Sequence, residues 1–97
     1  MGKIKRRIIM KHINNPEYTS NLPVDKQEKI QQIKSVIESN HFVSDRVDEL
    51  SRRGIETSTA PMGSGGRGQI KEMSSGKMRV QIGYGTGKHN YACVALI

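Results

Sequence analysis

Residues 25–39 read DKQEKIQQIKSVIES, in which apolar side chains recur at the spacing of a helix. Asp25 is a favourable N-cap, and Glu28 three positions later completes a pattern like the capping box. Lys and Gln fill most of the other helical positions. The stretch therefore predicts an amphipathic helix over 25–39. Its apolar stripe consists of Ile30, Ile33, Val36 and Ile37.

A second, shorter helix is predicted over 44–53. Ser44 can cap it, acidic residues follow in its first turns, and Arg52 and Arg53 suit its C-terminal end. Gly54 is then expected in the left-handed conformation, with Ile55 packed on Leu50 in a Schellman ending. We expect the two helices to pack on the core through Ile30, Ile33, Ile37, Val47 and Leu50.

Towards the C-terminus the period of the pattern changes to two. Met78, Val80, Ile82 and Tyr84 alternate with polar residues or glycine, which predicts a half-buried strand with a basic outer face. A turn at 74–76 precedes it, so residues 69–73 are expected to form a short partner strand. Residues 89–97 end in YACVALI, which is apolar on both faces, as in an interior strand.

Two segments give weaker patterns. Residues 3–13 are rich in Ile and end at a turn signal, which favours a strand but also fits a disordered basic arm. Residues 56–68 hold four Gly and one Pro and predict a Gly-rich loop. Gly63, Gly65 and Gly68 match G-x-G-x-x-G, but no strand precedes them and no helix follows, so we do not interpret them as a dinucleotide site.

The resulting fold prediction is α+β. With 97 residues the chain suits one small domain, a two-helix unit packed on a small antiparallel sheet in the order β-α-α-β-β-β. Residues 21–97 would form this domain, and residues 1–20 would add a basic N-terminal strand or arm.

Positive charge is concentrated at the two ends of the chain. The net charge of +7 divides into +4 for residues 1–20, −1 for 21–56 and +4 for 57–97. Such an excess favours polyanionic partners, although small proteins also carry one for solubility alone. If the two ends meet, the sequence predicts a small cytoplasmic regulatory protein that binds nucleic acid through phosphates, with DNA or RNA and the oligomeric state left open.

The candidate site combines cations from both ends of the chain. Distributed cations suit a phosphate backbone, and tyrosines can stack on unpaired bases. The candidate nucleic-acid-binding residues are Lys5, Arg6, Arg7, Lys11, Arg67, Lys71, Lys77, Arg79, Lys88 and His89.

Other site chemistries have little support in the sequence. The three His are scattered and lack the spacing of metal ligands, and Cys93 sits in the apolar final strand, so we expect no metal, no cofactor and no catalytic residue. One Cys excludes an internal disulfide and makes a reducing cytoplasm the default. Apolar runs are too short for a membrane span.

The predicted order of strand, two helices and three strands resembles that of the RelE/ParE toxin family, with the comparable C-terminal part at 68–71 and 77–80. That resemblance implies an endoribonuclease that cleaves with basic and tyrosine side chains. The counterparts would be Lys71, Arg79, Tyr84, Lys88 and His89.

A third interpretation concerns the helices alone. Residues 28–50 are similar in pattern to the paired helices of flagellar anti-sigma factors. The resemblance implies an inhibitor or adaptor that binds a protein partner through helix 25–39.

Overall fold

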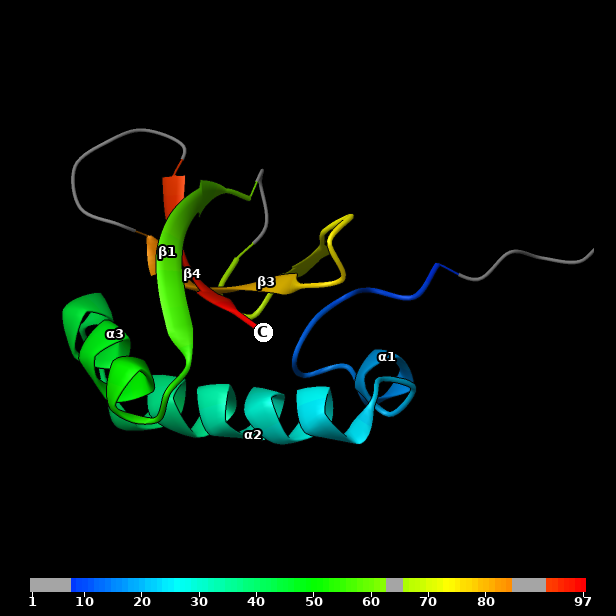
Figure 1. Ribbon diagram of the computed structural model, residues 1–97, viewed down its shortest axis with the longest axis horizontal. Coiled ribbons are helices and arrows are strands. Elements are labelled where there is room, and N and C mark those ends of the chain that lie inside the picture. The colour runs from blue at the N-terminus through cyan, green and yellow to red at the C-terminus, as the bar shows by residue number, and fades with distance from the viewer. Residues whose placement is uncertain (1–7, 63–65, 85–90) are drawn as a thin grey trace, which may run out of the picture.

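Helices come first and strands follow in the part of the chain that the structure, a computed structural model, describes: residues 8–62, 66–84 and 91–97. Figure 1 shows the arrangement. The helices are α1 (Pro16–Thr19), α2 (Val24–Ser39) and α3 (Val43–Arg52). The strands are β1 (Glu56–Pro61), β2 (Ile70–Glu72), β3 (Met78–Tyr84) and β4 (Tyr91–Leu96).

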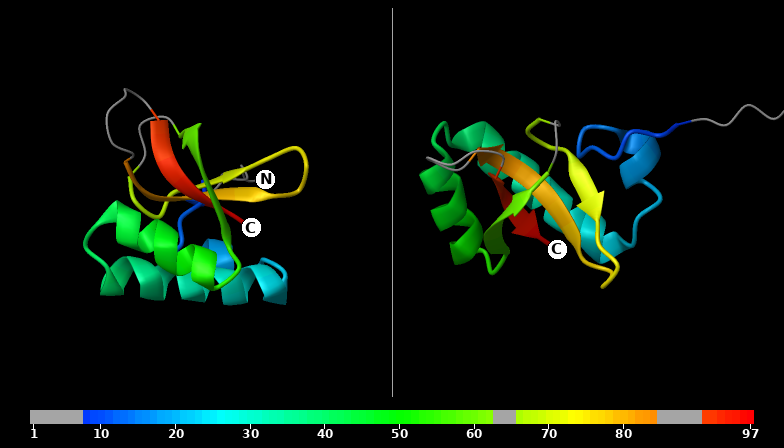
Figure 2. Two further views of the ribbon diagram at one scale, coloured as in Figure 1. Left: turned by 60° about the vertical axis from the view of Figure 1, so that its left-hand side comes forward. Right: turned by 90° about the horizontal axis from the view of Figure 1, so that it is seen from above.

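The four strands form one antiparallel sheet in the order β1-β4-β3-β2. Helices α2 and α3 lie on one side of this sheet, as the views in Figures 1 and 2 agree. The opposite side is called the outer face below. This arrangement confirms the predicted α+β class, while the order of elements differs from the prediction at two places.

The main core lies between the helices and the sheet. Ile30, Ile33 and Leu50 are buried there as predicted, and Val80 and Ile82 meet them from β3. The other two predicted core residues, Ile37 and Val47, are half-buried and pack against this cluster. Burying an aliphatic side chain of this size stabilises the fold by about 1.5–3 kcal/mol, so this layer supplies the main driving force.

The end of α3 follows the prediction in detail. Gly54 has φ +77°, and its N–H donates to the Ser51 carbonyl at 3.0 Å. The Ile55 N–H donates to the Leu50 carbonyl at 2.9 Å, and both side chains lie in the main core. These are the two bonds of a Schellman motif.

The predicted N-caps, Asp25 and Ser44, are wrong by two residues each, and each helix begins one residue earlier than predicted. Pro23 is the N-cap of α2 and Phe42 that of α3, and neither has a side-chain capping bond. The side-chain amide of Gln27 donates to the Leu22 carbonyl at 2.7 Å. This bond, in place of a side-chain cap, holds the residues before α2 against its first turn. Asp25 still lies in the first turn of α2, where its charge favours the helix dipole.

The prediction of a loop over 56–68 is wrong for its first six residues, which form β1. Every residue of β1 pairs with β4. This strand lies at the edge of the sheet and is mostly exposed, so it carries Thr and Ser and ends in Pro without an alternating apolar pattern. Residues 63–65 lie outside the described residues.

The predicted strand over 3–13 is not formed in the part that is described. Residues 8–13 meet the sheet through a single bridge between His12 and Gln69. The Ile70 N–H donates to the Lys11 carbonyl at 2.9 Å, so this segment lies beside β2. The short helix α1, which the sequence did not predict, follows with Asn15 as its side-chain cap.

Candidate nucleic-acid interface

The outer face of the sheet is less basic than the sequence suggested. Its centre is a second, small apolar cluster from β1, β4 and the residue after β1. The cluster contains Ala60, Met62, Ala92 and Val94, with Leu96 packed against it. Among the described residues, only the end of this face near β2 carries predicted cations, so a uniformly basic face was a wrong expectation.

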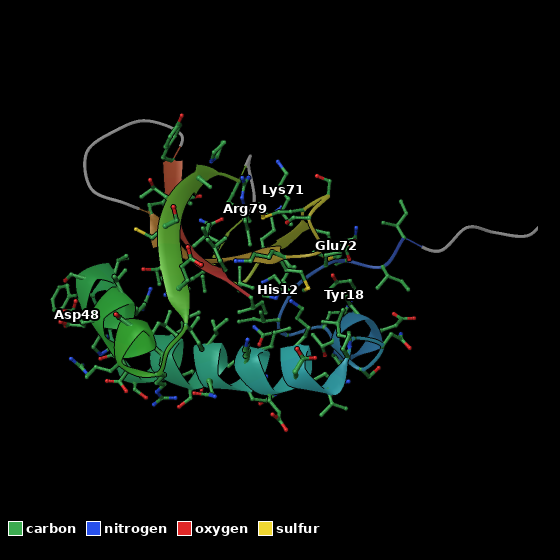
Figure 3. The ribbon with its side chains drawn as sticks, viewed as in Figure 1. His12, Tyr18, Asp48, Lys71, Glu72 and Arg79 are labelled. Atoms are coloured by element: carbon green, nitrogen blue, oxygen red, sulfur yellow. The ribbon has the colours of Figure 1, made fainter. Side chains whose placement is uncertain are left out.

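Lys71 and Arg79 form the cationic pair of the outer face. They are direct partners in the β2–β3 register, and Figure 3 shows both on the side of the sheet away from α2. All nine Asp and Glu residues of the chain lie in the described ranges, and none forms an ion pair with either side chain. Two neighbouring positive charges without a carboxylate attract an anion to this point.

Lys11 and Lys77 differ from Lys71 and Arg79 because each forms an ion pair with a carboxylate. Lys11 Nζ lies 3.4 Å from Glu72 Oε1, and Lys77 Nζ lies 3.6 Å from Glu56 Oε1. All four side chains are about half exposed, so the pairs are weak. The two ion pairs nevertheless offset the charges of Lys11 and Lys77. These lysines are therefore less suited to bind a phosphate group than Lys71 and Arg79.

Glu72 also joins α1 to β2. The Tyr18 hydroxyl donates to Glu72 Oε2 at 2.6 Å. Both residues are labelled in Figure 3. This bond, together with Lys11, lowers the pKa of Glu72. Burial, and then the bond to Glu72, raise the pKa of Tyr18 well above its ordinary range. The contact fixes the edge strand on which Lys71 lies.

His12 connects the leading segment to the residues before β2. Its Nδ1 accepts from the Asn14 N–H at 3.0 Å, which leaves Nε2 as the protonated nitrogen that donates to the Arg67 carbonyl at 3.0 Å. Lys11 and Arg67, from the two basic ends of the sequence, are thereby brought to one edge of the sheet. Lys5, Arg6, Arg7, Lys88 and His89 lie outside the described residues.

Arg67 does not join Lys71 and Arg79. It lies before the start of β2 and lines a pocket with Arg46 of α3. Arg46 is only 4% exposed, and the sequence analysis did not single it out. The sequence did contain a signal for its burial. Position 46 is three residues after Val43 and four before Leu50, so it lies on the face of α3 that packs inwards.

Other site chemistries find no structural support in the described residues. No group of three or more His, Cys, Asp or Glu within them could hold a metal ion. Cys93 is half-buried against the main core, and burial raises the pKa of its thiol, which disfavours the reactive thiolate. No helix of the described chain is long and apolar enough to cross a membrane.

Comparisons with protein-family models, curated proteins and solved structures found no match to this chain. The resemblance to RelE/ParE toxins was based on the order of the elements and a basic strand, and in the described residues the short helix α1, not a strand, precedes α2.

Proposed function

We propose that this protein is a small regulatory protein that associates with nucleic acid through phosphate contacts made by Lys71 and Arg79. The observation that carries the proposal is their cross-strand pairing on the outer face without a carboxylate partner. The net charge of +7 supports it, because an overall positive field speeds the approach of a polyanion.

The geometry favours contact with the backbone over reading of bases. Direct cross-strand neighbours lie about 5 Å apart at their β-carbons, and both side chains are long enough to adapt to one or two phosphates. Lys26 and Lys29 of α2 also form no ion pair within the described chain, and the control variant below tests that helix. Phosphate contacts position a nucleic acid without reading its sequence, so we expect weak sequence preference and strong salt dependence.

The test is a binding titration with fluorescently labelled single-stranded DNA, double-stranded DNA and RNA of one length. The double variant Lys71→Gln/Arg79→Gln should weaken binding by roughly tenfold or more at moderate salt. The slope of log affinity against log salt should fall in magnitude by about 2, because two phosphate contacts are lost.

The matched control is Lys26→Gln/Lys29→Gln, which removes the same charge from α2 on the other side of the sheet. This control should keep most of the affinity and the original salt slope. Equal losses in the two double variants would show that only net charge matters and would refute the assigned surface.

A further inference from the structure

A pocket of about 280 Å³ opens at the edge of β3, beyond the point where β2 accompanies it. Two of its lining residues are arginines from distant parts of the chain. The pocket is lined by Arg46, Arg67, Gln81, Gly83 and Tyr84. None of these residues belongs to the outer Lys71–Arg79 pair.

Arg46 is a buried cation that the fold holds in place. Its Nε donates to the Asn40 carbonyl at 2.7 Å, and its Nη1 donates to the Ile82 carbonyl at 2.8 Å. Asn40 is the C-cap of α2, so the negative end of that helix offsets part of the charge. No described carboxylate pairs with Arg46, and Nη2 has no hydrogen-bond partner among the described residues.

Arg67 adds a second positive charge to the same pocket. It forms no ion pair within the described chain, and its backbone is fixed by the bond from His12 to its carbonyl. Burial, and secondarily the charge of Arg67, lower the pKa of Arg46. Two neighbouring guanidinium groups repel each other, and an anion between them would turn this repulsion into attraction.

Gln81, which also lines the pocket, has a buried side-chain amide without a described hydrogen-bond partner. Its side chain is fully buried, and neither Oε1 nor Nε2 has a hydrogen-bond partner among the described residues. Leaving a buried amide unpaired costs about 1–3 kcal/mol, so proteins seldom keep one without a use. Gln81 also borders the irregularity between Gln81 and Gly83 where β3 shifts its register against β4.

Gly83 shows that the pocket wall is built for close approach. Its φ is +152°, and a Cβ at this position would collide with the Val43 side chain and lie 3.4 Å from Arg46 Nη1. A glycine is therefore required for α3 to bring Arg46 onto the edge of β3.

We propose that this pocket binds a phosphate group between Arg46 and Arg67. Guanidinium groups match the oxygens of phosphate by paired, charge-assisted hydrogen bonds, and two of them balance a phosphate of charge −1 to −2. The phosphate can belong to a free phosphate compound or to a nucleic acid. The proposal does not depend on the outer surface, because the two sites share no residue.

The first experiment measures thermal unfolding in sodium phosphate and in sodium chloride of the same ionic strength. Phosphate should raise the midpoint of the native protein by about 3 °C or more over chloride, because it binds the folded state. Arg67→Gln should abolish this shift, and since Arg67 is exposed the variant should still fold. Lys71→Gln, the charge-matched control, should keep the shift.

The second experiment identifies the source of the phosphate by titrating one labelled oligonucleotide with a 5′-phosphate and one with a 5′-hydroxyl. Preference for the phosphorylated end, lost in Arg67→Gln, assigns the pocket to a terminal phosphate. Equal weakening of both by Arg67→Gln assigns it to an internal phosphate, and an unchanged affinity for both assigns it to a free phosphate compound.

The proposal is overturned if phosphate stabilises the protein no more than chloride, or if Arg67→Gln keeps the full shift. Neither result bears on the outer surface, which is tested by Lys71→Gln/Arg79→Gln.

Discussion

The protein has two pairs of neighbouring cations, and the two pairs differ in their exposure to solvent. Lys71 and Arg79 face each other across two strands on the outer face, where solvent screens their charges. Arg46 is buried beside Arg67, and its guanidinium donates to two backbone carbonyls. A solvated charge can contribute to binding with little effect on the free energy of unfolding. Removal of a buried, hydrogen-bonded charge changes that free energy strongly.

The largest expected effect is on the buried cation. Arg46→Met keeps most of the side-chain volume but removes the donors to the Asn40 and Ile82 carbonyls. Since hydrogen bonds to charged groups contribute about 1.5–3 kcal/mol each, the free energy of unfolding should fall by about 3 kcal/mol. Urea denaturation measures this loss.

Arg52→Met is the control for that change. Arg52 is also on α3, but its side chain is 68% exposed and pairs with Glu49 at 2.9 Å. Its loss should cost less than about 1 kcal/mol. If both variants lost the same free energy, the contrast between buried and solvated arginines would be wrong.

The next effect has the opposite sign. Gln81→Met replaces a buried amide that has no described partner with an apolar side chain of similar shape. We expect the free energy of unfolding to rise by about 1 kcal/mol in urea denaturation without phosphate. Gln32→Met, at an exposed position of α2, should change it by less than half as much. A destabilised Gln81→Met protein would show that the amide makes a bond that the fold needs.

An effect of similar size and opposite sign is expected at the half-exposed contact between Tyr18 and Glu72. Tyr18→Phe removes the 2.6 Å hydrogen bond while keeping the buried ring. The free energy of unfolding at neutral pH should fall by about 1 kcal/mol, less than a fully buried charged bond, because solvent reaches Glu72.

The pH dependence of stability gives a second measure of the same contact. The pKa of Tyr18 is raised in the folded state, so above about pH 10 the unfolded chain loses the proton first and stability falls with rising pH. The pKa of Glu72 is lowered, so its contribution is present above the ordinary glutamate pKa and is lost as pH falls through the folded value. Unfolding midpoints from acid to alkaline pH should show both losses reduced in Tyr18→Phe. An unchanged profile would contradict the assignment.

The smallest effect completes the comparison. Lys71→Gln/Arg79→Gln should change the free energy of unfolding by less than about 0.5 kcal/mol, because neither side chain has an ion-pair partner in the described chain. Urea denaturation of the variant used in the binding titration provides this value. A large loss of stability would mean that the outer pair is structural.

The elements that the sequence predicted well are those whose signals lie close together along the chain. The stripe from Ile30 to Ile37 and the alternation around Val80 each repeat within one element. The same applies to Gly54, whose Schellman bonds join residues at most five apart. Such local patterns set the two long helices, β3 and the α+β class.

β1 was missed because its pairing partners in β4 lie thirty to forty residues away, and an edge strand needs no apolar alternation. Arg46, Arg67 and Gln81 come from α3, the residues before β2, and β3, and only packing brings them to one pocket. Composition and local periodicity thus determined the two long helices, the strand β3 and the charge of +7. Tertiary structure decided which charges are buried, paired or left facing solvent, because burial and pairing depend on residues distant in sequence.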